Sequence, residues 1–341
     1  MEDAVKSRLQ TVRLSEAQSF KNITIVPFIA PADGAFQYCA LGEALASSDV
    51  AITETSAGGS VPELMVINRG NKPVLLIDGE ELAGAKQNRV LNTSILLKEV
   101  SETKIPVSCT EQGRWSYVSK AFSESGNVMA YKSRSRKTRS VQCSLEACGA
   151  PTSDQGEVWS GIAELQAKAG AASPTAAMTD VYKTRDDDLR KCEDTFRPVP
   201  NQVGLIAFIG GKPAGLDMVS LTGAYSRLHP KLVRSYALEA LLDGRCSPDE
   251  RAQSKNKMRA SASSEVVGLA QAFLAEIVAA DERRFPSIGH GTDYRYKANA
   301  LAGSALVHES EVIHAAFFRL DEPVGTGKMT ALSNRRRRFT R

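Results

Sequence analysis

A series of short apolar segments occupies the first 120 residues and constrains the fold more than any other feature of this sequence. The segments are rich in Val, Ile and Leu, and Gly, Asn, Pro or Ser separates each from the next. Runs of this kind, bounded by turn-forming residues, are typical of strands that pack as an antiparallel sandwich or barrel. Strands are therefore predicted at 23–30, 36–41, 50–56, 62–69, 73–78, 89–98 and 104–109, with a short helix at 40–48.

Helical periodicity dominates the middle of the chain. In the clearest example, 154–170, apolar residues recur at spacings of three and four. Asp154 or Ser153 can accept the free amide hydrogens of its first turn, and Gly170 ends it. Further helices are predicted at 182–196, 216–228, 230–242 and 263–278. The last three of these are expected to pack as a unit against the sheet, because each needs a partner for its apolar face.

Strands return at 203–211, and 293–310 with 311–320 resembles a terminal hairpin. Strands, then helices, then strands predict an α+β fold: an antiparallel, β-rich N-terminal part with a helical segment and a C-terminal strand pair. We expect one large domain followed by a disordered basic tail. The expected domain covers 1–330, with β-rich 20–120, mainly helical 150–280 and terminal strands at 290–320, and the tail covers 331–341.

Composition argues against whole classes of protein. A chain of 341 residues with 42% hydrophobic residues can fill a sizeable core. It has no run of about 18 apolar residues and carries early acids, so neither a membrane span nor a secretory signal is predicted, and the cytoplasm is the expected location. The six cysteines form no CxxC pair and are expected to be reduced. The adjacent acids at 186–188 point in different directions on a helix, and no metal site is predicted.

Basic residues are concentrated in two places. The run at 131–140 carries five bases and no acid, and four arginines lie at 335–338. Either run could contact the phosphates of a nucleotide or a nucleic acid, but neither has interleaved aromatics or lies in a recognisable nucleic-acid module. A solvated loop and a frayed terminus are the favoured interpretations, and nucleic acid is not an expected partner.

The stretch Val74–Arg89, VLLIDGEELAGAKQNR, places charged and amide residues directly after an apolar run. If 74–83 is one strand, its acids alternate between faces; if Asp78–Gly79 forms a turn, the two glutamates lie at a strand end, where a site can be built. Glu can act as a base, amides donate and accept, and Arg binds phosphate with two hydrogen bonds. A solvated loop with weak ion pairs is the alternative. The candidate residues are Glu80, Glu81, Lys86, Gln87, Asn88 and Arg89.

A second polar cluster, IPVSCTEQGRWSY, also follows a predicted strand. It combines an acid, an amide, a guanidinium and an aromatic plane in Glu111, Gln112, Arg114 and Trp115. Trp can stack on a base or a sugar ring while Arg holds a phosphate. The alternative is a Trp that anchors the sheet, with Glu111 neutralising Arg114. Because sequential strands often pair, the two clusters are expected to belong to adjacent strands whose polar ends meet.

The third cluster, SIGHGTDYRYK, contains the best histidine candidate for chemistry. His290 lies between Gly289 and Gly291, where backbone amides can approach a ligand closely. Asp293 and Arg295 are two residues apart and are expected to share a strand face. The alternative is a structural loop histidine without a chemical role.

The blocks DGEELAGAKQNRVLNTSILL and IPVSCTEQGRW resemble the bacterial family of ADP-ribosylglycohydrolase- and rhodanese-phosphatase-associated proteins, and the similarity extends over about 40–320. The resemblance implies an association with enzymes of ADP-ribose and NAD turnover, an ADP-ribosylglycohydrolase-type enzyme as a partner, and a nucleotide or nucleotide-sugar ligand. It assigns no cofactor and no catalytic residue.

Two hypotheses follow. In the first, the protein is a hydrolase or transferase for ADP-ribose or a related nucleotide sugar; Glu81 or Glu111 is the base, and Arg89 and Arg114 hold phosphate. In the second, it is a non-catalytic module that binds the same ligand or a partner. A buried pair of acids with a raised pKa favours the enzyme, whereas acids that are all paired with Arg or Lys favour the binding module.

Overall fold

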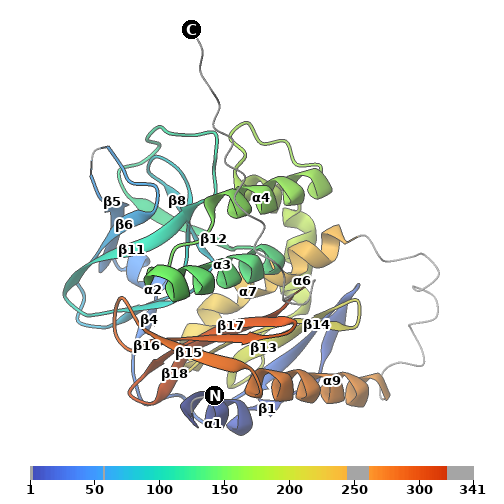
Figure 1. The fold of residues 1–341 in the computed structure, drawn as a ribbon. Coiled ribbons are helices and arrows are strands. Elements are labelled where there is room, and N and C mark those ends of the chain that lie inside the picture. The colour runs from blue at the N-terminus through green and yellow to red at the C-terminus, as the bar shows by residue number, and fades with distance from the viewer. Residues whose placement is uncertain (1–2, 57, 244–260, 321–341) are drawn as a thin grey trace.

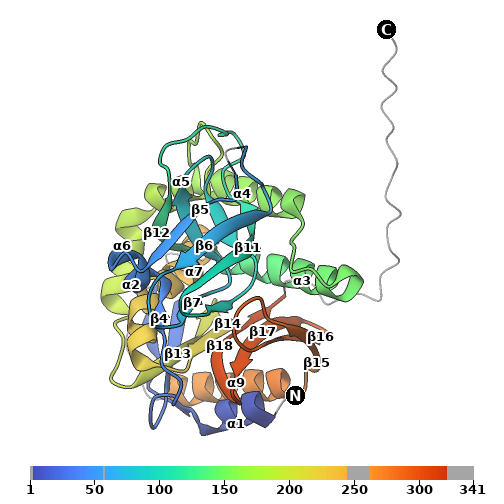
Figure 2. The same ribbon diagram turned by 90° about the vertical axis from the view of Figure 1, so that its left-hand side faces the viewer.

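The computed structural model describes residues 3–56, 58–243 and 261–320 and has an α+β fold, as the sequence predicts (Figure 1). The described strands form three sheets, of nine, six and three strands. Helices lie on both sides of the largest sheet, as the side view in Figure 2 makes clear. Among the described helices, none combines the length and the apolar character needed to cross a membrane. The basic tail at 331–341 lies outside the described residues.

The nine-stranded sheet joins distant parts of the chain. Its strand β3 pairs with β13, and β13 forms a hairpin with β14 through Gly210 and Gly211, whose φ angles of 57° and 76° glycine adopts without strain. β2 (Gln18–Phe20) lies beside β3. The other strands follow the order β1 (Arg13–Leu14), β3 (Ile23–Ile29), β13 (Gln202–Ile209), β14 (Lys212–Val219), β18 (Glu311–Arg319), β17 (Leu301–His308), β16 (Thr292–Ala298) and β15 (Asp281–Pro286).

Two smaller sheets contain the other strands of the N-terminal part. The three-stranded sheet has the order β10 (Ile95–Leu97), β7 (Val74–Leu76) and β4 (Cys39–Ala40). The six-stranded sheet has the order β12 (Phe122–Val128), β8 (Glu80–Gly84), β9 (Arg89–Leu91), β11 (Ser101–Cys109), β6 (Glu63–Asn68) and β5 (Val50–Glu54). Strand β3, which the sequence places among the strands of a sandwich or barrel, pairs instead with β13 of the nine-stranded sheet.

The helices divide between the two faces of the nine-stranded sheet. One core joins α7 to Leu205 and Ala207 of β13, and another joins α1 and α9 to the opposite face through Ile206 and Phe208. The expectation that the last three predicted helices form one unit is wrong, because α7 and α9 lie on different faces. The helices are α1 (Asp3–Thr11), α2 (Leu41–Ala46), α3 (Tyr131–Cys148), α4 (Gln155–Ala169), α5 (Met178–Thr184), α6 (Asp186–Thr195), α7 (Thr222–Leu242) and α9 (Ser261–Val278).

Several predicted boundaries shift. Asp154 caps α4 through the amides of its first turn and Gly170 ends it, as expected. The first residues of the predicted helix at 216–228 belong to strand β14 instead. Leu216 and Met218 face one core and Asp217 faces the other side, which is the two-residue period of a strand. Helix α7 then runs through Pro230 without a break, because its buried residues on either side of the proline hold it in the core.

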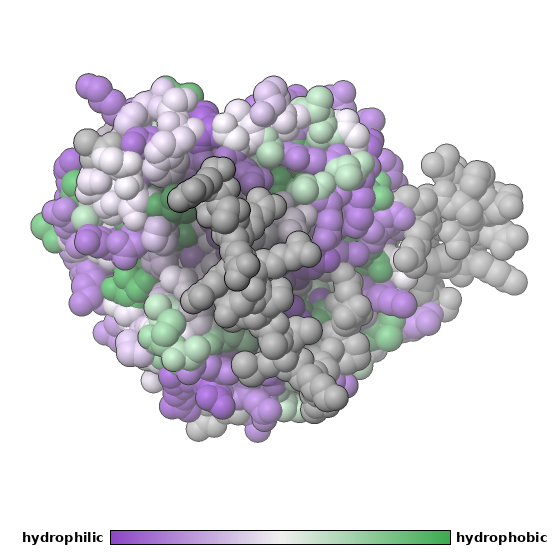
Figure 3. Space-filling view, turned by 45° about the horizontal axis from the view of Figure 1, so that its top comes forward, coloured by the Kyte–Doolittle hydropathy of each residue, from purple (hydrophilic) through white to green (hydrophobic). Residues whose placement is uncertain are grey.

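The predicted C-terminal strand pair is part of a larger group. Strands β15 to β18 form an antiparallel meander, and β15 and β12 were not expected from the sequence. On the face that Figure 3 shows, the hydrophobic residues lie in small separate areas among hydrophilic ones.

The basic run at 131–140 is not a solvated loop. It forms the first part of α3, and Arg134 and Lys137 point into the protein, with exposed fractions of 0% and 1%. The other bases pair with carboxylates on the surface: Lys132 with Asp243, Arg136 with Glu164 and Arg139 with Glu157. Because all five bases have acidic partners, this run offers little free charge to a nucleic acid.

Candidate functional site

A tight turn at Asp78–Gly79 positions the first polar cluster. It separates β7 from β8, so the interpretation with a turn is the correct one. Gly79 has φ of 83°, and a Cβ there would lie 2.7 Å from the Arg134 side chain, which explains the glycine. Glu80 and Glu81 are the first residues of β8, and as neighbours in a strand they point to opposite faces of the sheet.

Strand β9 lies between β8 and β11 and brings the first two clusters together. Glu81 lies opposite Val90, and Arg89 lies opposite both Leu82 and Cys109. The expectation that these strands are adjacent and that their polar ends meet is confirmed. The same register places Glu81 and Arg89 on opposite faces of the sheet, because residues that face each other across strands share a face. The candidate residues of the first cluster are thus divided between the two faces of the six-stranded sheet.

Glu81 is a fully buried carboxyl group with one unsatisfied oxygen. Its Oε1 accepts a hydrogen bond from Thr110 Oγ1 at 2.8 Å, whereas Oε2 has no hydrogen-bond partner among the described residues. Burial raises the pKa of Glu81 to about 7, although the polar groups of Thr110, Ser125 and Asn127 lower it; the charge of Glu111 adds to the rise. Near neutral pH both protonation states are populated, as acid–base chemistry requires.

A cleft of about 460 Å³ lies beside Glu81. Two of its lining residues, Ser125 and Asn127, are also the residues that approach the Glu81 carboxyl. They belong to a bulge in which β12 changes register with β8 between Glu124 and Val128. The bulge therefore separates the carboxyl from the cleft by one layer of side chains. The lining residues are Ser125, Gly126, Asn127, Thr179, Tyr182, Lys183, Asp186, Glu193, Pro230 and Arg234.

The charges of the cleft are balanced. Arg234 donates to Asp186 at 2.9 Å, to Glu193 at 2.8 Å and to Asn127 Oδ1 at 3.2 Å. The second cation, Lys183, is 77% exposed and lies at the rim. Two cations and two carboxylates give this lining no net charge, so it suits hydroxyl groups better than a multiply charged anion.

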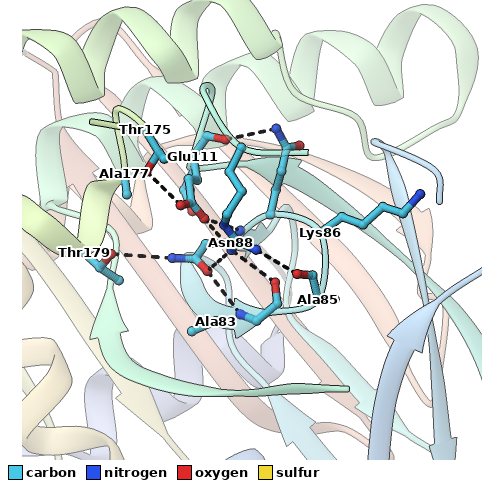
Figure 4. A network of polar contacts seen from close by, with 12 residues as sticks. Ala83, Ala85, Lys86, Asn88, Glu111, Thr175, Ala177 and Thr179 are labelled. Carbon is cyan, nitrogen blue, oxygen red and sulfur yellow. Dashed lines mark hydrogen bonds and ion pairs between the residues drawn. The ribbon is translucent and has the colours of Figure 1, made fainter. Parts of the chain in front are cut away.

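Glu111 and Arg114 form a structural network rather than a free pair. Figure 4 shows Glu111 with two of its other partners, Asn88 and Thr175. Arg114 Nη2 donates to Glu111 Oε2 at 2.5 Å, Thr175 Oγ1 donates to Glu111 Oε1 at 2.8 Å, and Asn88 N donates to Oε2 at 3.2 Å. Burial raises the pKa of Glu111, but these donors lower it more, and the net direction is downward. Arg114 also donates to the carbonyl oxygens of Ala85 and of two further residues, Gly84 and Ser116. The interpretation in which Glu111 neutralises Arg114 fits this geometry.

The remaining residues of these two clusters make local contacts. Glu80 is buried and accepts a hydrogen bond from Lys231 at 2.6 Å. Gln87 Nε2 donates to the Glu111 carbonyl at 3.0 Å, while Gln112 is exposed. Trp115 is 48% exposed, so it is not a buried anchor of the sheet.

The third cluster lies apart from Glu81. His290 bridges to Leu96 of β10, and its Nε2 lies 3.0 Å from Glu99 Oε2. Asp293 and Arg295 share a face of β16, as expected, and form a buried ion pair at 2.7 Å. Among the described residues, the hydrogen bonds of these three side chains lead to Glu99 and Thr93, and none leads to the cleft.

A buried ionic network behind the Asp78–Gly79 turn was missed in the sequence. Arg134 of α3 binds Asp217 of β14 with two hydrogen bonds, at 3.0 and 2.7 Å, and Lys137 contacts Asp78. A usable signal was present, because Arg134, Lys137, Val141 and Leu145 recur at helical spacing. Tyr236, Thr138, Ser94 and His314 complete the network.

A family model described as ARG and Rhodanese-Phosphatase-superfamily-associated Protein domain matches residues 11–318. ARG stands for ADP-ribosylglycohydrolase, so the description records an association with that enzyme. The matched range contains the polar clusters and every residue that lines the cleft. No curated protein and no solved structure matches the chain. Within the described residues, no group of His, Cys, Asp or Glu side chains is arranged to hold a metal ion.

Proposed function

We propose, from the premise that the chain belongs to the ARG and Rhodanese-Phosphatase-superfamily-associated Protein family, that it is a hydrolase or transferase for ADP-ribose or a related nucleotide sugar. The observation that carries this proposal is the Glu81 carboxyl, which is buried, has a pKa of about 7 and keeps one oxygen without a partner among the described residues. Such groups concentrate at catalytic sites, because a proton donor or acceptor works best when its pKa lies near the working pH.

Glu81 has the two roles that a hydrolysis or transfer reaction needs. As the carboxylate it accepts a proton from an attacking water or hydroxyl group, and as the acid it donates a proton to the leaving oxygen. Ser125 and Asn127 approach the carboxyl on one side and line the cleft on the other. Because Ser125 and Asn127 lie between the cleft and Glu81, the proposed proton transfer between a ligand and Glu81 runs through the Ser125 hydroxyl.

The cleft fits the sugar end of the proposed ligand. Its volume of about 460 Å³ lies within the range of small-molecule sites, roughly 300–1,000 Å³. Ribose hydroxyls can donate to Asp186 and Glu193 and accept from Asn127. The association with ADP-ribosylglycohydrolase in the family description favours ADP-ribose over other sugars, and it makes an enzyme of that type the proposed partner.

A non-catalytic binding module is the second candidate. It is favoured by Glu80 and Glu111, whose carboxylates are paired with Lys231 and Arg114. These pairs are what a scaffold requires, and they leave Glu81 as the acid that distinguishes the two candidates.

Calorimetry with millimolar ADP-ribose, NAD and AMP tests the ligand. We expect ADP-ribose to bind, and Asn127→Ala to weaken binding about tenfold, which corresponds to the loss of one hydrogen bond of about 1.4 kcal/mol. Gln112→Ala is the control, because Gln112 is exposed and lies outside the cleft lining. Absence of heat with all three compounds contradicts the ligand, and equal binding by the two variants places the site elsewhere. Chromatography of the same mixtures then shows whether product has formed. Product indicates an enzyme, and binding without product indicates a binding module.

A further inference from the structure

Arg89 is a buried cation whose guanidinium lacks a full set of hydrogen-bond partners among the described residues, although the charges of Glu54 and Glu111 act on it. Its side chain is 0% exposed, and it forms no ion pair within the part of the chain that the structure describes. Nη1 donates to Gln87 Oε1 at 2.9 Å and to the Asn88 carbonyl at 3.4 Å, whereas Nε and Nη2 have no hydrogen-bond partner there. A buried guanidinium with two unsatisfied donors is costly unless an acceptor reaches it.

The unsatisfied atoms define the geometry of that acceptor. Nε and Nη2 lie on one edge of the guanidinium and point in nearly parallel directions, which matches two oxygens of one phosphate or carboxylate. The facing residue, Cys109, donates its thiol hydrogen to Gln87 Oε1 at 3.2 Å. Glu54 lies nearby, but its Oε1 accepts the Lys86 amide at 3.4 Å, and its buried Oε2 has no partner among the described residues.

The Trp115 ring lies beside Arg89, and a second cation, Lys86, lies beside Trp115 and Tyr117. The ring of Trp115 lies 5.7 Å from the Arg89 guanidinium carbon. Lys86 Nζ lies 5.1 Å from the Trp115 ring and 5.2 Å from the Tyr117 ring, and it donates to the Gly58 carbonyl at 2.6 Å. Trp115 and Tyr117 are 48% and 51% exposed. In Figure 4, Lys86 extends away from the network around Glu111.

We propose that Arg89 is the anchor of a phosphate-binding site that is separate from the cleft beside Glu81. The Nε–Nη2 edge binds two phosphate oxygens, Lys86 contributes the second positive charge, and Trp115 covers the site as a side chain that moves aside or stacks on an attached ring. The ligand chemistry is a phosphate group, free or as part of a nucleotide. The register places Arg89 and Glu81 on opposite faces of the sheet. The phosphate site can therefore exist whether or not Glu81 catalyses the proposed reaction.

Thermal unfolding and tryptophan fluorescence test the phosphate site in the full chain. In a buffer without phosphate, added inorganic phosphate or AMP is expected to raise the melting temperature with concentration, while sodium chloride at equal ionic strength is not. Bound phosphate is also expected to change Trp115 fluorescence. A larger effect of AMP than of inorganic phosphate identifies a nucleotide site, and equal effects identify a site for phosphate alone.

Two variants and a control decide the role of Arg89. Arg89→Met is expected to lose the response to phosphate. Because it removes a buried guanidinium whose Nε and Nη2 have no hydrogen-bond partner among the described residues, it is also expected to melt no lower than the wild type without phosphate. Arg139→Met is the control, because it removes a surface arginine of α3. Trp115→Phe is expected to lose the phosphate-induced change in fluorescence, which identifies Trp115, and not Trp159, as the source of that change. A wild type without response, or an Arg89→Met variant that responds like it, overturns the proposal.

Discussion

Glu81→Gln is expected to lower the turnover of ADP-ribose strongly and to stabilise the fold at alkaline pH. Glutamine keeps the shape of the protonated acid and still accepts the Thr110 hydrogen bond, but it cannot exchange a proton. Loss of a general acid–base group lowers turnover by a factor on the order of 10² to 10⁴. If Glu81→Gln is both more stable and less active than the wild type, the Glu81 carboxylate costs stability and serves function.

The stability gain depends on pH in a defined direction. The pKa of Glu81 is about 7 in the fold, against an ordinary value of 4.5. The buried acid therefore contributes its full stability below pH 4.5, loses it as the pH rises toward 7, and costs roughly 3 kcal/mol above that range, at about 1.36 kcal/mol for each pKa unit. Urea unfolding at pH 5 and pH 8 measures the difference between Glu81→Gln and the wild type, which is expected to be much larger at pH 8 than at pH 5.

Glu111→Gln is a control with the opposite sign. The pKa of Glu111 is lowered, so its carboxylate contributes stability above the unfolded pKa and loses it in acid. Glu111→Gln is therefore expected to be less stable than the wild type at pH 8, with a smaller deficit in acid. If both variants are more stable than the wild type at pH 8, the stability gain is not specific to the buried Glu81 carboxylate, and the prediction for Glu81 is contradicted.

Arg134→Met is expected to destabilise the protein by about 3–5 kcal/mol, because it leaves the buried Asp217 carboxylate uncompensated. Burial raises the pKa of Asp217, but Arg134 lowers it more, and the carboxylate stays ionised. Urea unfolding measures the loss. The double variant Arg134→Met/Asp217→Asn is expected to recover part of it, because it removes both charges.

Arg139→Met on the same helix is the matched control for this prediction. Arg139 is exposed and its pair with Glu157 spans 3.6 Å, so removal is expected to change stability by no more than about 0.5 kcal/mol. Losses of similar size in Arg134→Met and Arg139→Met would contradict the structural role of the buried network.

The local order of strands and the strand-end cluster could be predicted from the sequence. Short apolar runs between turn-forming residues predicted the strands around both polar clusters, and the Asp-Gly pair indicated the turn that places Glu80 and Glu81 at a strand end. The N-cap at Asp154 was predictable because it depends only on residues of its own first turn.

Long-range pairing could not be predicted. Arg134 is 83 residues from its partner Asp217, and without that partner a run of bases resembles a solvated segment. The division of Glu81 and Arg89 between two faces depends on the register of β8 with β9, which a shift of one residue would reverse. The raised pKa of Glu81 likewise depends on burial beneath β12, a strand that the sequence analysis did not find.

The pH dependence of kcat/KM for ADP-ribose is the most direct test of Glu81 as the acid–base group. The wild type is expected to show a limb with an apparent pKa near 7, the value to which burial raises Glu81. In Glu81→Gln that limb is expected to be absent from the residual activity, while ADP-ribose still binds. A Glu81→Gln variant that turns over ADP-ribose at the wild-type rate, with the same limb near pH 7, would contradict the central proposal.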